Sequence, residues 1–231
     1  MMNFRCYSEH LCVISYKEIA LSLLSWEWSK IIQSIASISM VWIAYKALTT
    51  WKQKSTADNK ISFIGELSDE IHNFIVVISP AIEVYRFIKI GIGSHSSQDH
   101  YNNIKNRPIS AAYIEKYGKE DGHLLFEKLN SCTSSVSKIN SLITKGQIYN
   151  FIKYEDCQNS CALLTWQYDR LQAVAGLISQ QSWNWENTKV VETLNKVLST
   201  EIGDIEQNIK QQNIKFIEFA KDNYCSVFKN T

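Results

Sequence analysis

Few residues of this chain have the types and spacing that could support chemistry. Glu120 and His123 form one Glu-x-x-His element, which is part of the ligand set of a di-iron site in a helical bundle. Such a site needs a second Glu-x-x-His on a facing helix, and the sequence has no other. Cys157 and Cys161 lie one helical turn apart, but no further Cys or His completes a zinc site. We therefore expect no metal, and we expect these cysteines to be small buried or half-buried side chains.

The other polar motifs are also incomplete. His95, Asp99 and His100 fall in a polar stretch that is typical of a solvated loop. Arg86 and Arg107 lack the histidine shortly downstream that would match the signature of helical ribonucleases. No Walker A, dinucleotide-binding or nucleophile-elbow motif occurs. The sequence thus predicts a protein that is not an enzyme and that binds no cofactor.

The composition is that of a folded, helix-rich chain. The 231 residues are 45% hydrophobic and 20% charged, so the chain can bury a core. It has only two Pro and eight Gly, whereas a β-sandwich or barrel needs a turn about every 8–12 residues. The formal net charge of +1 provides no electrostatic basis for nucleic-acid binding. We expect no direct sequence-specific contact with DNA or RNA.

The most informative segment is an uncharged run over residues 31–45, which Lys30 and Lys46 bracket. As a helix, its fifteen residues rise about 22 Å, less than the roughly 30 Å of a bilayer's hydrocarbon layer. Lysine stems can reach toward the headgroups, and aromatic residues stand at both ends, where a membrane interface favours them. We predict a transmembrane anchor over residues 28–54, carried by Trp28, Lys30, Ile31, Ile35, Ile38, Trp42, Tyr45, Lys46 and Trp51. A buried helix of a bundle without membrane contact remains the alternative.

The two faces of this predicted helix differ. Ile31, Ile35, Ile38, Trp42 and Tyr45 form a bulky stripe. The opposite stripe is small and weakly polar, and it is formed by Gln33, Ser34, Ser37 and Ala44. Small residues let helices approach closely in lipid, so this stripe is a candidate helix–helix face and indicates a homo-oligomer.

Lysines near the anchor predict its orientation. Lys46, Lys52, Lys54 and Lys60 follow the uncharged run and outnumber the lysines before it, which favours a cytoplasmic C-terminal portion. We expect a single-pass protein of a bacterial inner membrane. Residues 1–27 are expected to form an amphipathic segment at the membrane surface. Their apolar stretch over residues 11–26 leaves open a second span, paired with the anchor as a hairpin.

The remainder, residues 56–231, has apolar residues at helical spacing almost throughout. One stripe runs from Ile61 to Ile88 at steps of three and four, with Pro80 expected to kink or break the helix. A loop over residues 91–108 separates it from a second helical region at 109–144, which could be interrupted near Gly118 and Gly122. Further helices are expected at 147–181 and 188–224. Short turns between long helices predict an elongated antiparallel helical bundle, so the fold class is all-α with an N-terminal transmembrane helix.

Two tryptophans mark the turn before the last helix. Trp183 and Trp185 are expected to pack at one end of the bundle, and an exposed partner-binding patch is the alternative.

The anchor, the long helix with Pro80, the tryptophan turn and the final helix together resemble a class of bacterial membrane-anchored helical proteins. In size and in its short anchor, the chain is similar to the membrane effectors of retron anti-phage systems. Those systems pair a reverse transcriptase and its hybrid RNA–DNA with a toxic inner-membrane protein. The resemblance implies an effector that partners hold inactive and that, once released, oligomerises and disrupts the inner membrane. It also implies a protein partner, such as a reverse transcriptase carrying RNA–DNA. The alternative function is a membrane-tethered scaffold or sensor whose bundle binds a cytosolic protein.

Overall fold

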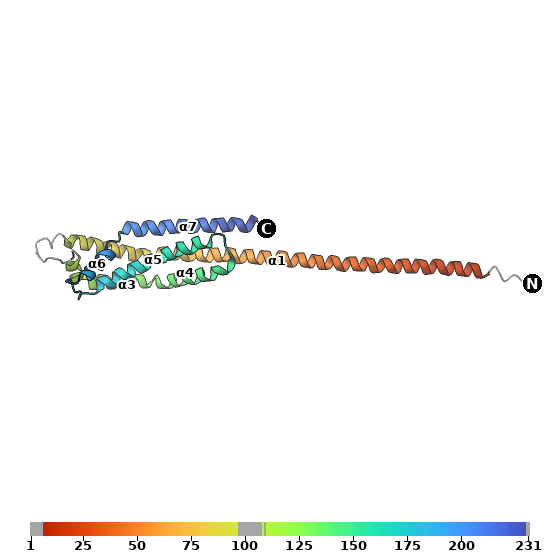
Figure 1. Cartoon of the computed structure of the whole chain (residues 1–231), viewed down its shortest axis with the longest axis horizontal. Coiled ribbons are helices and arrows are strands. Elements are labelled where there is room, and N and C mark those ends of the chain that lie inside the picture. The colour runs from red at the N-terminus through yellow and green to blue at the C-terminus, as the bar shows by residue number, and fades with distance from the viewer. Residues whose placement is uncertain (1–6, 97–107, 109, 230–231) are drawn as a thin grey trace, which may run out of the picture. The chain divides into compact units, whose positions relative to one another are not determined.

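The computed structural model describes residues 7–96, 108 and 110–229, of which residues 7–20, 22–27, 96 and 227–229 are described by their backbone alone. Every regular element in this part of the chain is a helix, and it contains no strand (Figure 1). The prediction of an all-α protein is confirmed. The chain divides into two compact units, Met1–Thr56 and Ala57–Thr231.

The first unit consists of the N-terminal part of α1, the helix Tyr7–Ser96. Uninterrupted helix is expected here because the first Gly or Pro after Tyr7 is Gly65. The predicted anchor lies within this unit, as residues 28–54 of α1.

In the second unit, α1 contributes one apolar stripe to the core. The stripe predicted from the sequence is buried at Leu67, Ile71, Phe74, Ile78, Ile82, Tyr85 and Ile88. Steps of three and four residues place these side chains on one face of the helix, which the other helices cover. This part of the prediction is confirmed.

The helix α1 continues through Pro80, so the break that the sequence suggested there does not occur. Proline has no N–H, which leaves the carbonyl of Val76 without its helical hydrogen bond. Both residues are exposed, so water can bond to that carbonyl. In addition, the thiol of Cys132 donates a hydrogen bond of 3.2 Å to the carbonyl of Val77.

The region at 109–144 forms several short helices instead of one. They are α2 (Ala111–Tyr113), a π-helical turn η2 (Ile114–Gly118), α3 (Lys119–Asn130) and α4 (Thr133–Gly146). The interruption between α3 and α4 falls at residues 131–132, not at the glycines. Both glycines lie in helical segments against the end of a later helix, α5 (Tyr154–Ser179). A Cβ at Gly122 would lie 2.7 Å from the Cβ of Ser179, and one at Gly118 would overlap the carbonyl of Ile178. Glycine is therefore required for close packing, not for a break.

The helix predicted at 147–181 begins later than expected. A 3₁₀ turn, η3 (Gln147–Tyr149), follows α4, and α5 spans Tyr154–Ser179. Between them, Asn150 and Lys153 adopt left-handed backbone angles, with φ of 48° and 54°.

The last predicted helix is broken into α6 (Thr188–Leu198) and α7 (Ile202–Lys229). Three side chains from other helices stabilise the break by hydrogen bonds to residues at the end of α6 and between α6 and α7. Tyr85 and Lys89 of α1 donate to the carbonyls of Thr200 and Leu198, both at 2.9 Å. Arg170 of α5 donates to the hydroxyl of Thr200 at 3.0 Å. These contacts come from distant parts of the chain, so the helical pattern of residues 188–224 does not reveal them.

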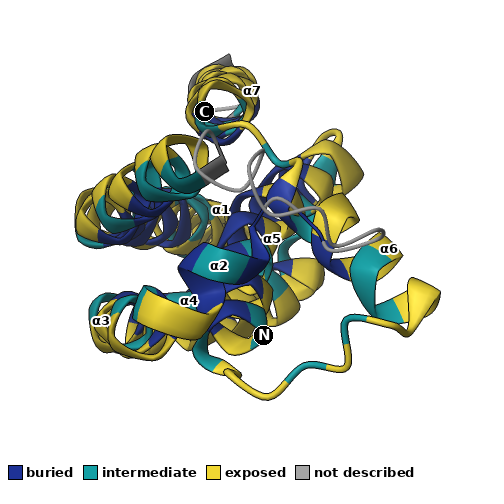
Figure 2. Ribbon diagram, turned by 90° about the vertical axis from the view of Figure 1, so that its left-hand side faces the viewer, coloured by how far each residue is buried: buried dark blue, intermediate teal, exposed yellow. Residues whose placement is uncertain are grey.

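The helices of the second unit pack around α5, which contacts α3, α4, α6 and α7. Successive long segments run in alternating directions: α1, then α3 and α4, then α5, then α7 (Figure 1). Buried residues lie on the sides where these helices face one another (Figure 2). The unit is thus an antiparallel helical bundle, as predicted.

Candidate functional site

The predicted anchor residues are exposed along α1. Every large apolar side chain within residues 28–51 is exposed, with exposed fractions from 48% at Ile31 to 75% at Met40. They include the predicted Trp28, Ile31, Ile35, Ile38, Trp42, Tyr45 and Trp51, together with Ile32, Met40, Val41, Ile43 and Leu48. We refer to residues 28–51 as the exposed apolar segment.

Apolar side chains cover all sides of this segment. With about 100° between successive residues, Ile31, Ile35, Ile38 and Trp42 lie on one side and Met40 on the opposite side. Val41 and Leu48 lie on one flank between these sides, and Ile32 and Ile43 lie on the other. A surface helix of a water-soluble domain has a polar face, whereas a helix that is apolar all round needs an apolar environment on every side. The segment therefore lacks the pattern of a helix that lies half in water.

Four serine and threonine hydroxyls of the segment bond to their own helix. Ser34, Ser37 and Ser39 donate to the carbonyls four residues earlier, at 2.9, 2.8 and 2.8 Å, and Thr49 donates to the carbonyl of Lys46 at 2.9 Å. A hydroxyl that is satisfied within its helix costs less to move out of water than one that is not. These residues thus add little polarity to the segment's surface.

The lysines at the ends of the uncharged run are placed differently from its apolar residues. The ammonium of Lys46 lies 4.8 Å from the centre of the Trp42 ring, so that its stem lies along the helix surface. Lys30 is exposed at the other end. Charged heads on long apolar stems suit a boundary between an apolar and an aqueous phase.

The predicted helix–helix face is exposed but less uniform than expected. Gln33, Ser37 and Ala44 share a side of α1, with Ser34 at its edge. Met40 and Leu48 lie on the same side, at helical spacing from Ser37 and Ala44. The amide of Gln33 makes no hydrogen bond within the part of the chain that the structure describes, in contrast to the hydroxyls of Ser34 and Ser37. Gln33 is therefore the residue of this face whose donors and acceptor are all available to another helix.

Across residues 7–96, 108 and 110–229, the structure contains no helix that is long and apolar enough to cross a membrane.

The bundle residues with possible chemistry are not brought together. Within the described ranges, no group of three His, Cys, Asp or Glu side chains could hold a metal. Cys157 and Cys161 are buried, as predicted. Their mutual hydrogen bond and their burial raise the pKa of the Cys157 thiol, which keeps it protonated. A protonated buried thiol is a poor nucleophile and a poor metal ligand.

His95 lies in the last turn of α1, not in the predicted polar loop. Its ring packs edge-on against Tyr113 and Tyr117, with centroid distances of 5.7 and 5.2 Å. The hydroxyl of Tyr113 donates to Asp121, and burial raises the pKa of this phenol. Asp99 and His100 lie outside the described residues. The cluster is aromatic packing against the end of α1.

The two tryptophans of the turn before α6 bond to the bundle. The indole N–H of Trp183 donates to the carbonyl of Leu177 at 2.9 Å. That of Trp185 donates to a carboxylate oxygen of Glu115 at 2.7 Å. These bonds favour packing at the bundle end over an open partner-binding patch.

A buried carboxylate was not predicted from the sequence. Glu70 is 6% exposed and accepts hydrogen bonds from Ser135 and from Asn73, the latter at 3.2 Å. The ammonium of Lys138 lies 2.8 Å from its second oxygen. Burial alone would raise the pKa of Glu70, but the bonds from Lys138, Ser135 and Asn73 outweigh it and lower the pKa. A glutamate inside an apolar stripe, one residue before Ile71, was the available signal.

The chain matches no family model, no curated protein and no solved structure.

Proposed function

We propose that this protein is a membrane-attached helical protein whose exposed apolar segment inserts into a lipid bilayer. The observation that carries the proposal is the all-round exposure of apolar side chains over residues 28–51. Contiguous apolar surface of this kind marks a site of membrane or protein contact, because its exposure to water is unfavourable. A bilayer provides an apolar environment on every side at once.

The ends of the uncharged run determine how it inserts. Residues 31–45 rise about 22 Å and thus fall short of a hydrocarbon layer of roughly 30 Å. Lys30 and Lys46 extend this length, because their stems reach along the helix while their charges stay at the headgroups. Trp28, Trp51 and the Trp42–Lys46 pair supply interfacial contacts near the ends. The segment crosses as a single span, with the bundle on the cytoplasmic side.

Insertion favours assembly of several copies. In lipid, the amide of Gln33 has no water to bond to, and the hydroxyls of Ser34 and Ser37 already bond to their own helix. A second helix bearing the same amide offers a partner. Such bonds between membrane helices contribute about 0.6–2 kcal/mol each. The small side chains of Ser37 and Ala44 allow the close approach that the bond requires.

The activity that we propose for the assembled segment is disruption of a bacterial inner membrane. In this proposal the protein is an effector of anti-phage defence, held inactive by a partner such as a reverse transcriptase carrying RNA–DNA. The resemblance to retron effectors motivates the defence role. The inserted, self-associating helix is the part of the protein that would disrupt the membrane.

Expression in a bacterium with a membrane-potential dye tests the activity. The full chain, expressed without any partner, should depolarise the cells, and a variant that lacks the apolar segment should not. Cells that stay polarised while the full chain is found in their membrane fraction would refute the effector role. A reporter that is active only in the periplasm, fused after Thr231, should be silent; periplasmic activity would reverse the orientation.

A second candidate function is a membrane-tethered scaffold, and exposed apolar residues on the bundle favour it. Phe87 and Ile90 are three residues apart on α1 and are 69% and 61% exposed. Val76 lies on the same side of the helix and is also exposed. Such a stripe can bind a helix of a cytosolic partner. Under this function, Phe87→Ser with Ile90→Ser should abolish partner recovery and leave membrane attachment unchanged.

A further inference from the structure

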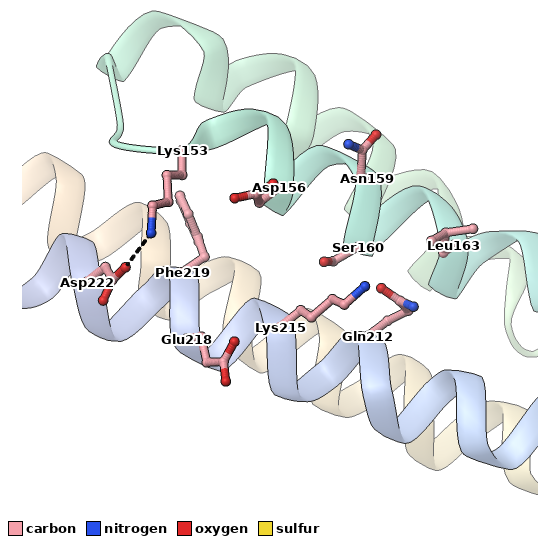
Figure 3. A pocket seen from close by; sticks show the side chains of 10 residues that line it. All are labelled: Lys153, Asp156, Asn159, Ser160, Leu163, Gln212, Lys215, Glu218, Phe219 and Asp222. Carbon is pink, nitrogen blue, oxygen red and sulfur yellow. Dashed lines mark hydrogen bonds and ion pairs between the residues drawn. The ribbon is translucent and has the colours of Figure 1, made fainter.

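A cavity of about 370 Å³ lies between α5 and α7 in the second unit. Asp156 and Ser160 project from α5, and Gln212 and Lys215 project from α7 (Figure 3). One end is closed by an ion pair between Lys153 and Asp222, with 3.5 Å between the ammonium nitrogen and a carboxylate oxygen. Asn159, Leu163, Glu218 and Phe219 complete the lining.

The cavity interrupts the apolar seam by which α7 packs on the bundle. The buried residues of α7 follow steps of four and three: Ile205, Ile209, Gln212, Phe216, Phe219 and Asn223. Gln212 occupies a position where this spacing predicts an apolar residue. It is 3% exposed, and its amide oxygen has no hydrogen-bond partner among the residues that the structure describes.

The other amide in the seam shows how a satisfied residue is arranged. Asn223 accepts from the N–H of Ile152 at 2.8 Å and donates to the carbonyls of Ile152 and Phe219, both at 3.0 Å. Buried polar groups in proteins are nearly always bonded in this way. An amide oxygen that lacks a partner and belongs to a residue lining a cavity indicates a missing hydrogen-bond donor.

We propose that this cavity binds a small zwitterion with an ammonium and a carboxylate group, the chemistry of a free amino acid. The ammonium pairs with the carboxylate of Asp156 and, once a rotation of the Gln212 side chain turns its buried amide oxygen into the cavity, donates to that oxygen. The carboxylate pairs with the ammonium of Lys215. Phe219 and Leu163 offer apolar surface to the rest of the molecule.

The charges of the lining set the preference within this class. The Lys153–Asp222 pair leaves Lys215 as the remaining cation and Asp156 and Glu218 as the remaining anions. A ligand with one extra positive charge balances this set. Basic amino acids should therefore bind more tightly than neutral ones, and acidic ones should bind least.

Thermal unfolding of the full chain in detergent micelles, with each L-amino acid added separately, tests the proposal. A ligand at about a hundred times its Kd should raise Tm by about 5–10 °C. Gln212→Leu should raise the Tm of the unliganded protein, because it continues the apolar seam, and should abolish the response to the ligand. Lys215→Gln and Asp156→Asn should each raise the Kd of the amino acid at least tenfold, so that more ligand is needed for the same rise in Tm.

Lys221→Gln is the matched control, since Lys221 is exposed on α7 and does not line the cavity. It should respond as the wild type does. The proposal fails if no amino acid raises the Tm of the wild type, or if Gln212→Leu and the wild type show equal shifts. This test is independent of membrane insertion, so its failure would leave the proposed function unaffected.

Discussion

Ile38→Lys places a charge at the centre of the exposed apolar segment. Ile38 is the middle residue of the uncharged run and is 70% exposed in α1. A lysine there has about 11 Å of helix on either side before the run ends, farther than its stem can reach without deforming the bilayer. The substitution removes no contact within the bundle, so it tests insertion separately from folding.

The expected effect follows from the cost of each residue at the centre of a membrane helix. Isoleucine favours insertion by about 0.3–0.6 kcal/mol, and lysine opposes it by about 2.5–3.5 kcal/mol. The difference of about 3–4 kcal/mol lowers the insertion equilibrium by roughly a hundredfold to a thousandfold. Insertion of the wild type is expected to be marginal, because its uncharged run rises only about 22 Å. The variant should therefore be almost completely released from the membrane.

Cell fractionation with an alkaline carbonate wash measures this release. Wild-type protein should stay in the washed membrane pellet, and Ile38→Lys should move to the supernatant. Thr50→Lys is the control, because Thr50 stands beside Trp51 and Lys52, where a charge can lie at the interface. Equal retention of Ile38→Lys and wild type would refute insertion. Wild type in the supernatant as an oligomer would show that the apolar segment serves protein assembly instead.

Three further substitutions test separate features. Ser37→Leu should reduce crosslinking between copies in membranes without reducing insertion, because leucine adds apolar surface but prevents close approach. Ile35→Leu is its control, and equal crosslinking in both variants would place assembly elsewhere. Glu70→Gln should lower the free energy of unfolding by about 1–3 kcal/mol at about pH 7. Because the folded pKa of Glu70 lies below the ordinary value of 4.5, this difference should be complete above pH 4.5 and should vanish as pH falls through the folded pKa. A difference that persists in acid would contradict a charge effect. Asn223→Ala should cost about 2 kcal/mol, since it leaves a backbone N–H and a carbonyl unpaired. Lys221→Ala should change stability by less than about 0.5 kcal/mol, and equal losses would contradict the role of Asn223.

The helices of the bundle were predictable to the extent that local spacing determines them. The stripe of α1 followed from apolar residues at steps of three and four, and it is buried as expected. The break between α6 and α7 did not follow, because Lys89 and Arg170 hold it from elsewhere in the chain. Gly118 was read as a local interruption, but its role depends on the close approach of α5.

The two candidate sites also differ in how far the sequence predicts them. The apolar segment could be recognised from composition alone, since an uncharged run between two lysines is a local feature. The α5–α7 cavity could not be recognised from the sequence. The sequence shows that Gln212 interrupts a heptad-like pattern, but only the packed helices show that its amide oxygen lacks a partner within the described part of the chain.

The two units bury their apolar residues differently, and this contrast bears on function. In Ala57–Thr231, α1 turns one stripe inward, and the other helices cover it to form a complete core. In residues 28–51 the same helix exposes large apolar side chains on every side. The core of the bundle contains none of these residues, so the stability of the bundle does not explain them. A segment that is costly in water and unnecessary for the core requires an apolar environment outside the bundle, and in the function that we propose this environment is a bilayer.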